Sequence, residues 1–274
     1  MEIIDQKILH DSVTWPLSPK YAVRTHNYAD DYLTFVALES GTFTFAPQSG
    51  NVISYSTDNG TTWTQGNSVT VNNGDKVLWK GTMTPTSNQG IGTFSSTGNF
   101  DVQGNAMSLL FGDNFKGQTN LTGKDYAFYY LFNGNTKVVN AENLSLPATT
   151  LTEWCYRYMF IGCTNLTTAP ELPATTLAEG CYHSMFQGCT SLTTAPELPA
   201  ETLVNYCYGF MFLNCTSLNY IKAMFTTTPS TSYTQNWVIG VSASGTFVKN
   251  AVAEWDVSGI NGIPNGWTVE TANS

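Results

Sequence analysis

The chain has 274 residues, 42% of them hydrophobic, which is enough to bury the core of one large domain or of two ordinary ones. Charged residues make up only 11%, against roughly 25% in an average soluble protein, and Thr, Ser, Asn and Gly fill the polar positions instead. The net charge of -9, with 11 basic residues spread along the chain, argues against a basic stripe for nucleic acid or for an anionic membrane surface.

The N-terminal segment 1–30 differs from the rest of the chain. It lacks the basic start and long apolar run of a secretory signal, and no later stretch approaches the ~20 apolar residues of a membrane helix. We therefore expect no membrane insertion and no export, unless a leader has been removed. Residues 1–30 are turn-rich and are interpreted as an N-terminal arm that docks on a partner subunit or, equally, as a strand or loop folded onto its own domain.

Residues 31–104 alternate apolar and polar side chains with a period of two, as in Thr42-Phe43-Thr44-Phe45. Short β-rich runs separated by Gly, Asn and Asp predict a small antiparallel β-sandwich. Residues 56–63 match the Asp-box pattern of sialidase-like propellers, but only once. We interpret that motif as a structural hairpin, so a glycan-active enzyme is the most distant of the function classes considered.

Between Leu151 and Leu218 the chain repeats itself three times, at the fixed interval that separates Cys155 from Cys181. The positions that keep this interval are Cys155/Cys181/Cys207, Met159/Met185/Met211, Phe160/Phe186/Phe212 and Cys163/Cys189/Cys215. A fixed period of this length is typical of a solenoid, in which each unit buries its apolar face against its neighbours. Thr150 and Glu153 fit a helix-capping box, and Pro170 closes a short strand, so one coil is predicted to contain a helix, a turn and a strand.

The repeats thus predict an α/β solenoid over residues 105–223, with parallel short strands on one side and helices on the other. The segments 107–112 and 127–134 are interpreted as degenerate early repeats that cap it. Residues 224–274 abandon the period and are expected to close the open end as a C-terminal cap.

The six cysteines all lie in the repeats at matching positions and form no C-x-x-C pair, which predicts buried free thiols. The alternative is a disulfide between stacked neighbours such as Cys155 and Cys181. Only three histidines exist, and neither a nucleophile elbow nor calcium-loop spacing is present. We therefore expect a non-catalytic protein without metal or cofactor.

The repeat Cys-Tyr-x-x-Met-Phe-x-Gly-Cys-Thr-x-Leu-Thr-Thr-Ala-Pro-Glu-Leu-Pro-Ala resembles the BspA-like leucine-rich repeat family, most clearly from Leu144 to Phe225. Residues 114–117, 245–248 and 263–269 also resemble parts of surface proteins from anaerobic gut bacteria and their phages. The resemblance implies a right-handed α/β solenoid used for adhesion to host proteins, cells or glycans, with no catalytic residues to carry over.

Comparison of the repeats separates a constant core from variable positions, which are Trp154/Gly180/Tyr206, Arg157/His183/Gly209 and Tyr158/Ser184/Phe210. Aromatic and Arg side chains are favoured at binding hot spots. We therefore predict a ligand-binding patch on the helical side, formed by Trp154, Arg157, Tyr158, His183 and Tyr206. The alternative is that these residues pack against the flanking domains or a neighbouring subunit.

Host attachment is the function that these features favour: a non-catalytic recognition protein that binds a host cell-surface protein or glycan. The chain lacks the leader and lipid-anchor cysteine of the secreted family members, so we expect it on the surface of a phage virion, with a bacterial surface or secretion as the alternative. A purely structural virion or assembly component is the second class, with residues 1–30 contacting other virion subunits. Homo-oligomer formation is left open.

Overall fold

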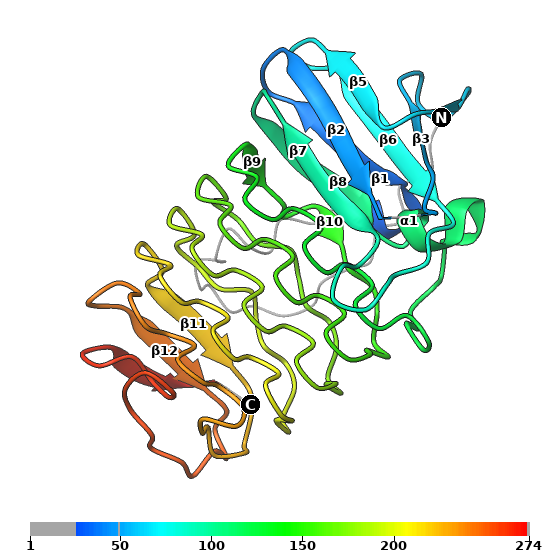
Figure 1. Ribbon diagram of the computed structural model, residues 1–274. Helices are drawn as coiled ribbons and strands as arrows, with labels where there is room; N and C mark the ends of the chain where they lie inside the picture. Colours follow the sequence, from blue (N-terminus) through cyan, green and yellow to red (C-terminus); the bar gives the residue numbers. More distant parts are fainter. Residues whose placement is uncertain (1–25, 49, 273–274) are drawn as a thin grey trace, which may run out of the picture.

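The structure is a computed structural model that describes residues 26–48 and 50–272; most of the predicted N-terminal arm lies outside these ranges. The described residues form three β-sheets, and a layered β-domain is followed by a stack of coils (Figure 1). No helix in this part of the chain is both long enough and apolar enough to cross a lipid bilayer.

The first sheet has seven strands in the order β10-β8-β1-β6-β3-β4, with β9 also paired to β8. Its strands are β1 (Leu33–Ala37), β3 (Ile53–Ser56), β4 (Thr64–Gln65), β6 (Lys76–Gly81), β8 (Phe100–Asn105), β9 (Val138–Asn140) and β10 (Leu144–Ser145). A second sheet packs on it, in the order β5-β2-β7, from β2 (Gly41–Pro47), β5 (Ser68–Val71) and β7 (Gly92–Ser96). The 3-10 helix η2 (Tyr28–Asp30) precedes β1.

Aromatic rings fill the space between these two sheets. The centroid of the Phe35 ring in β1 lies 5.3 Å from that of Phe43, 4.7 Å from that of Phe94 and 4.8 Å from that of Phe100, and all four side chains are buried. The apolar residues of the alternating sequence pattern therefore point inward, because successive side chains of a strand point to opposite faces of the sheet. Because β9 and β10 come from the first coil and pair in parallel with β8, the layered domain and the coils share one sheet and one continuous core.

The predicted α/β solenoid of leucine-rich repeats is wrong, because the repeats contain no helices. The only α-helix in residues 26–48 and 50–272 is α1 (Ser108–Phe111), which precedes the repeats and leads into the 3-10 helix η3 (Gly112–Asn114). The short strand predicted before Pro170 is reduced to an isolated bridge between Asn140 and Thr168. The capping box of Thr150 and Glu153 also fails, since no helix begins there and the carbonyls of both residues accept from amides of the preceding coil.

Overlapping four-residue turns take the place of the predicted helices. We call the segments 124–135, 152–163, 178–189 and 204–215 the turn stack. Within each segment, alternate amides donate three residues back, as Arg157 does to Trp154 at 3.1 Å. The amides between them donate to the next coil, as Tyr156 does to Cys181 at 2.9 Å and Tyr158 to His183 at 3.1 Å. An α-helix would use all of these donors internally, so the hydrogen bonds that join the coils would be lost.

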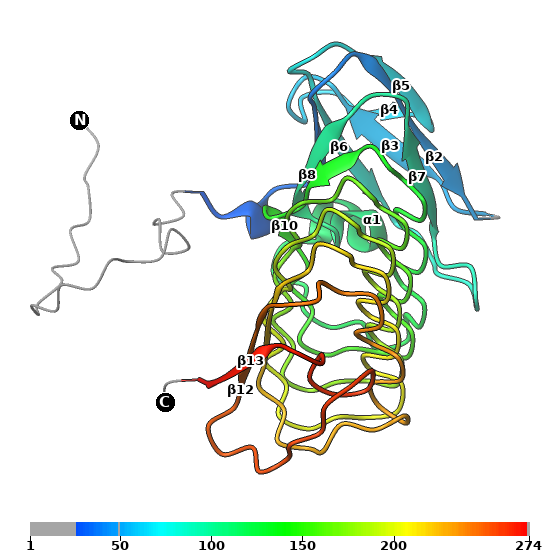
Figure 2. The same ribbon diagram turned by 90° about the vertical axis from the view of Figure 1, so that its left-hand side faces the viewer.

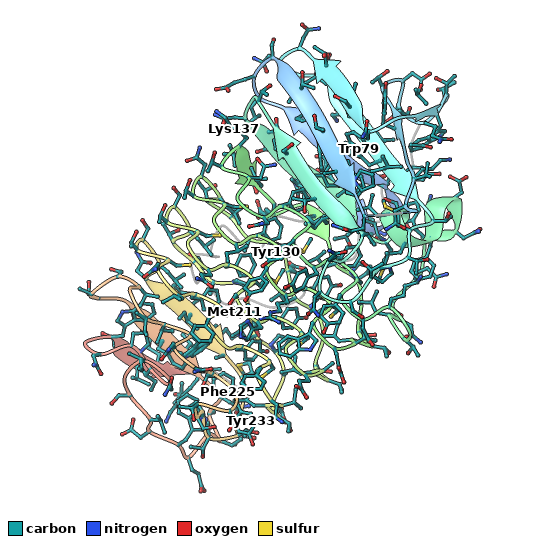
Figure 3. All side chains as sticks on the ribbon, viewed as in Figure 1. Trp79, Tyr130, Lys137, Met211, Phe225 and Tyr233 are labelled. Atoms are coloured by element: carbon teal, nitrogen blue, oxygen red, sulfur yellow. The ribbon has the colours of Figure 1, made fainter. Side chains whose placement is uncertain are left out.

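The inner side of the turn stack consists of ladders of like residues. Tyr156, Tyr182 and Tyr208 stack at 5.7 and 6.0 Å with nearly parallel rings, and Phe160 and Phe186 stack at 5.7 Å in the same way. The six cysteines are buried free thiols, which confirms that prediction. Figure 2 shows the backbone of the stacked coils from a perpendicular direction, and Figure 3 shows the side chains that the coils carry.

The C-terminal residues continue the stack. Strands β11 (Tyr220–Ala223), β12 (Thr246–Lys249) and β13 (Thr268–Thr271) form a parallel sheet in which β13 is the outer strand. Trp237 lies in the core beneath them and donates to the Gly262 carbonyl at 2.9 Å. The predicted division into residues 31–104, 105–223 and 224–274 stays a prediction.

We predict that Cys189→Ala destabilises the stack by about 1–3 kcal/mol, because it leaves a cavity and removes a hydrogen bond to a buried carbonyl. Cys189 Sγ donates to the Phe160 carbonyl of the preceding coil at 3.1 Å. Urea unfolding measures the change. Asn165→Ala, at an exposed position, is the control and should change stability by less than about 0.5 kcal/mol. Equal effects of the two substitutions would contradict the assigned role of the thiol.

Candidate functional site: an aromatic face on the turn stack

The outer side of the turn stack contains residues with a left-handed backbone at every fourth position. In the third turn of each coil these residues are Gly or Asn, the usual choices for positive φ: Gly134, Gly162, Gly188 and Asn214. In the first two turns they are mostly aromatic, with φ between 56° and 60°: Tyr126, Tyr130, Trp154, Tyr158, Tyr206 and Phe210. A bulky residue held in this conformation costs about 1 kcal/mol or more.

The five residues predicted as a site lie together, on turns and not on the predicted helices. Trp154 contacts His183 edge-on at 5.7 Å and stacks on Tyr206 at 6.2 Å. The Arg157 guanidinium lies between two rings, with its Cζ 4.6 Å from the Trp154 ring centroid and 4.5 Å from that of Tyr158. Arg157 Nη2 also donates to the Tyr158 hydroxyl at 2.9 Å.

Four further aromatic residues belong to the same surface and were missed. Tyr130 stacks on Tyr158 at 4.9 Å, Tyr129 contacts Tyr130 at 4.3 Å, and Phe210 lies 5.3 Å from His183. We call the whole set the aromatic face: Tyr126, Tyr129, Tyr130, Trp154, Arg157, Tyr158, His183, Tyr206 and Phe210. The first coil was overlooked because the interval from Tyr130 to Tyr158 is longer than that from Tyr158 to Ser184, so the comparison of the repeats did not align it.

The coil of residues 178–189 departs from the aromatic pattern at both positions, where it carries Gly180 and Ser184. A Cβ on Gly180 would overlap ring carbons of Trp154, so the indole lies over this glycine and reaches toward Tyr206. Ser184 is buried, and its Oγ lies 3.1 Å from His183 Nδ1. The small residues of this coil therefore make room for side chains of its neighbours.

His183 is neutral in this surrounding. Burial, and to a smaller extent the positive charge of Arg157, together lower its pKa from 6.5 to about 4. Arg157 forms no ion pair with any described residue, so the two stacked rings are the main compensation for its charge.

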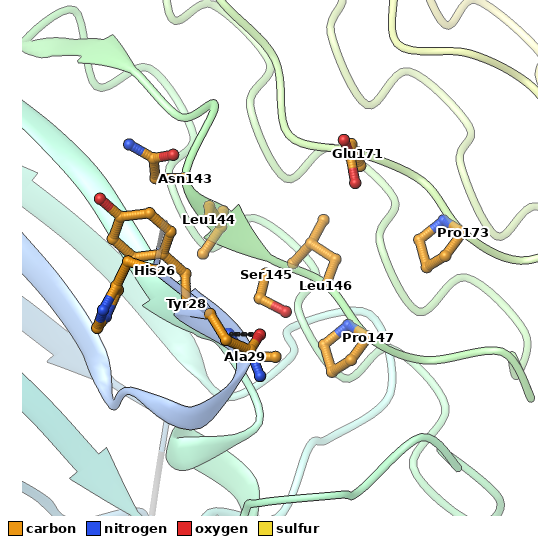
Figure 4. A pocket seen from close by; sticks show the side chains of 11 residues that line it. His26, Tyr28, Ala29, Asn143, Leu144, Ser145, Leu146, Pro147, Glu171 and Pro173 are labelled. Carbon is orange, nitrogen blue, oxygen red and sulfur yellow. Dashed lines mark hydrogen bonds between the residues drawn. The ribbon is translucent and has the colours of Figure 1, made fainter. Parts of the chain in front are cut away.

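Two cavities lie elsewhere. One, of about 480 Å³, lies between Tyr28 and the Pro-containing edge of the first two coils, where Pro147 and Pro173 line it (Figure 4). The other, of about 490 Å³, lies on the outer face of the seven-stranded sheet and is lined by Tyr32, Lys76 and other residues. Neither cavity is lined by a residue of the aromatic face.

No protein-family model matches the chain, and no match was found among curated proteins or among solved structures. The resemblance to the BspA-like family therefore depends on the repeat residues alone and stays a prediction.

We predict that Gly180→Ala destabilises the protein by about 2–3 kcal/mol, because the new methyl group adds to the left-handed strain and displaces the Trp154 ring. Gly162→Ala is the matched control. It has the same kind of φ, at 72°, but its nearest neighbour is Gly134 Cα at 3.5 Å, so only about 1 kcal/mol is expected. Chemical denaturation compares the two, and equal losses would show that the indole does not lie over Gly180.

We also predict that His183 makes stability fall as the pH is lowered. Unfolded histidine gains a proton near pH 6.5, whereas folded His183 does so only near pH 4, so the unfolded state binds more protons between these values. The contribution of His183 to the free energy of unfolding is complete above pH 6.5. It falls by on the order of 3 kcal/mol as the pH is lowered to 4. Urea unfolding of the wild type and of His183→Gln at several pH values isolates it. A difference between them that does not vary with pH would contradict the prediction.

Proposed function

We propose that this protein is a non-catalytic recognition module that attaches its carrier, a phage virion or a bacterial cell, to a host cell-surface protein or glycan through the aromatic face. The resemblance of the repeat to BspA-like surface proteins supports the adhesive role. A place on the virion surface is proposed on the same resemblance.

The single observation that carries the proposal is the choice of residue at the left-handed positions. The third turn of each coil has Gly or Asn at this position, and these residues adopt positive φ with little strain. The first two turns keep Trp154, Tyr158, Tyr206 and others in spite of the strain. Gly or Asn would relieve the backbone strain at these positions as well, so the retention of aromatic residues favours a functional reason for the rings.

The composition of the face also fits recognition. Trp, Tyr and Arg are the residues most often found at binding hot spots, where a few side chains supply most of the affinity. Here Trp154, Arg157 and Tyr158 contact one another and are partly exposed. Because each ring is already held by its neighbours, little side-chain entropy remains to be lost on binding.

We predict that labelled wild-type protein attaches to at least one cell type in a panel of anaerobic gut bacteria and mammalian epithelial cells. The double variant Trp154→Ala/Tyr158→Ala should attach at least about tenfold more weakly, because it removes both rings that sandwich Arg157. Flow cytometry measures attachment.

Val252→Ser is the control, since this side chain is 72% exposed and lies outside the aromatic face. A wild type that attaches to no cell in the panel would contradict the proposed function. Unchanged attachment of the double variant would exclude the aromatic face as the contact surface.

A purely structural virion or assembly component is the second candidate, favoured by the C-terminal end of the stack. Strand β13 is exposed along its whole length and, among the described strands, pairs on one side only, with β12. Val252, Ile260 and Val269 are exposed apolar side chains in the same terminal region. An outer strand of this kind is a surface on which another chain can pair.

A further inference from the structure

Tyr206 is the most accessible part of the aromatic face. Its side chain is 41% exposed, and it is the one aromatic residue among the exposed large apolar residues of the described chain. Within residues 26–48 and 50–272, its ring contacts only the rings of Trp154 and His183, both from the coils that precede it. The column of rings therefore ends at Tyr206.

The next coil leaves the far side of this ring open. Ser232 follows Tyr206 at the same interval at which Tyr206 follows Gly180, so a further ring of the column would stand at this position. Tyr206 N donates to the Ser232 carbonyl, which places the two residues side by side. Ser232 is small and exposed, and its coil is marked by Tyr233 in Figure 3. A flat ligand ring stacked on Tyr206 would continue the column at this position.

The rim of this position is polar and uncharged. Asn205 precedes Tyr206, and Thr231 precedes Ser232 in the next coil; both side chains are exposed. Their amide and hydroxyl groups both donate and accept hydrogen bonds, as the hydroxyl groups of a sugar require.

The charges nearby disfavour an anionic ligand. Glu179 is exposed in the preceding coil, where Gly180 N donates to the Asn205 carbonyl at 2.9 Å. The nearest cation on the aromatic face, Arg157, is two coils away from Tyr206 and is held between its own two rings. The other rings of the aromatic face are less exposed than Tyr206, so the open stacking area is that of a single ring. A saccharide ring fits this area better than a protein, whose interface covers about 800 Å² on each partner.

We propose that the aromatic face binds a neutral glycan, and that one saccharide ring stacks on Tyr206 above Ser232, with its hydroxyl groups bonded to Asn205 and Thr231. This inference rests on the proposed attachment function and names its ligand. It also assigns to Ser232 the role of keeping the stacking position empty.

The test is a glycan array followed by titration calorimetry with the neutral tetrasaccharide that binds best. A galacturonate tetramer serves as the charged comparison. The wild type should bind the neutral tetrasaccharide and not the galacturonate. Tyr206→Ala should weaken binding at least about tenfold by removing the ring, whereas Tyr206→Phe should keep it within about threefold.

Ser232→Phe is the decisive variant, because it fills the stacking position while leaving Tyr206 in place. It should weaken binding at least about tenfold, whereas Ser217→Phe, at another exposed serine, should leave binding unchanged. Thermal unfolding confirms that the variants are folded.

Three results would overturn the inference: stronger binding of galacturonate, wild-type affinity in Ser232→Phe, or no neutral glycan bound on the array. If cell attachment persists in the last case, the ligand assignment fails and the attachment function remains. If attachment is absent as well, both fail.

Discussion

The alternation of backbone hydrogen bonds in the turn stack is the constraint on which the rest of the structure depends. Every second amide closes a turn within its coil, and the amides between them reach the next coil, as Tyr156 does to Cys181. This arrangement satisfies the backbone in both directions at once. It also requires a left-handed residue at every fourth position, so it fixes which side chains point inward and which point outward.

The inner and outer positions of the turn stack meet this constraint with different kinds of residue. The inner positions repeat the same residue types, so that Tyr156, Tyr182 and Tyr208 stack in register. The thiols of Cys163 and Cys189 donate to carbonyls of the preceding coil. The outer positions vary from coil to coil and hold large rings in a backbone conformation that such residues rarely adopt. The uniform interior provides stability, and the variable exterior is where a ligand is proposed to bind.

The sequence predicted the inside of the coils well, because the equal spacing of Cys155, Cys181 and Cys207 identifies them as a buried column. It did not distinguish helix from turns. Gly162 has φ of 72°, but a single glycine of this kind fits a helix C-terminus as well as a turn. Nothing in the type of Trp154 predicts positive φ, because the intrinsic preference of such a residue opposes it.

One signal for the turns was present in the spacing. The inward pairs Cys155-Tyr156 and Met159-Phe160 recur at every fourth position and are followed by Cys163. In an α-helix each step of four rotates a side chain by about 40°, so three steps would carry it off the buried side. Two inward and two outward residues in strict alternation therefore favour a period of four over the helical period. The aromatic face could be predicted only in part, because the first coil is offset from the spacing of the later ones.

The coil-to-coil hydrogen bonds have a consequence for how such a chain can change its length. Each turn segment bonds only to the segment directly before and the one directly after it. Insertion or deletion of one whole repeat unit would therefore break and remake only the contacts at a single junction. The recognition surface can thus be lengthened, shortened or reshuffled by whole units, while the sheet that anchors the first coil stays unchanged.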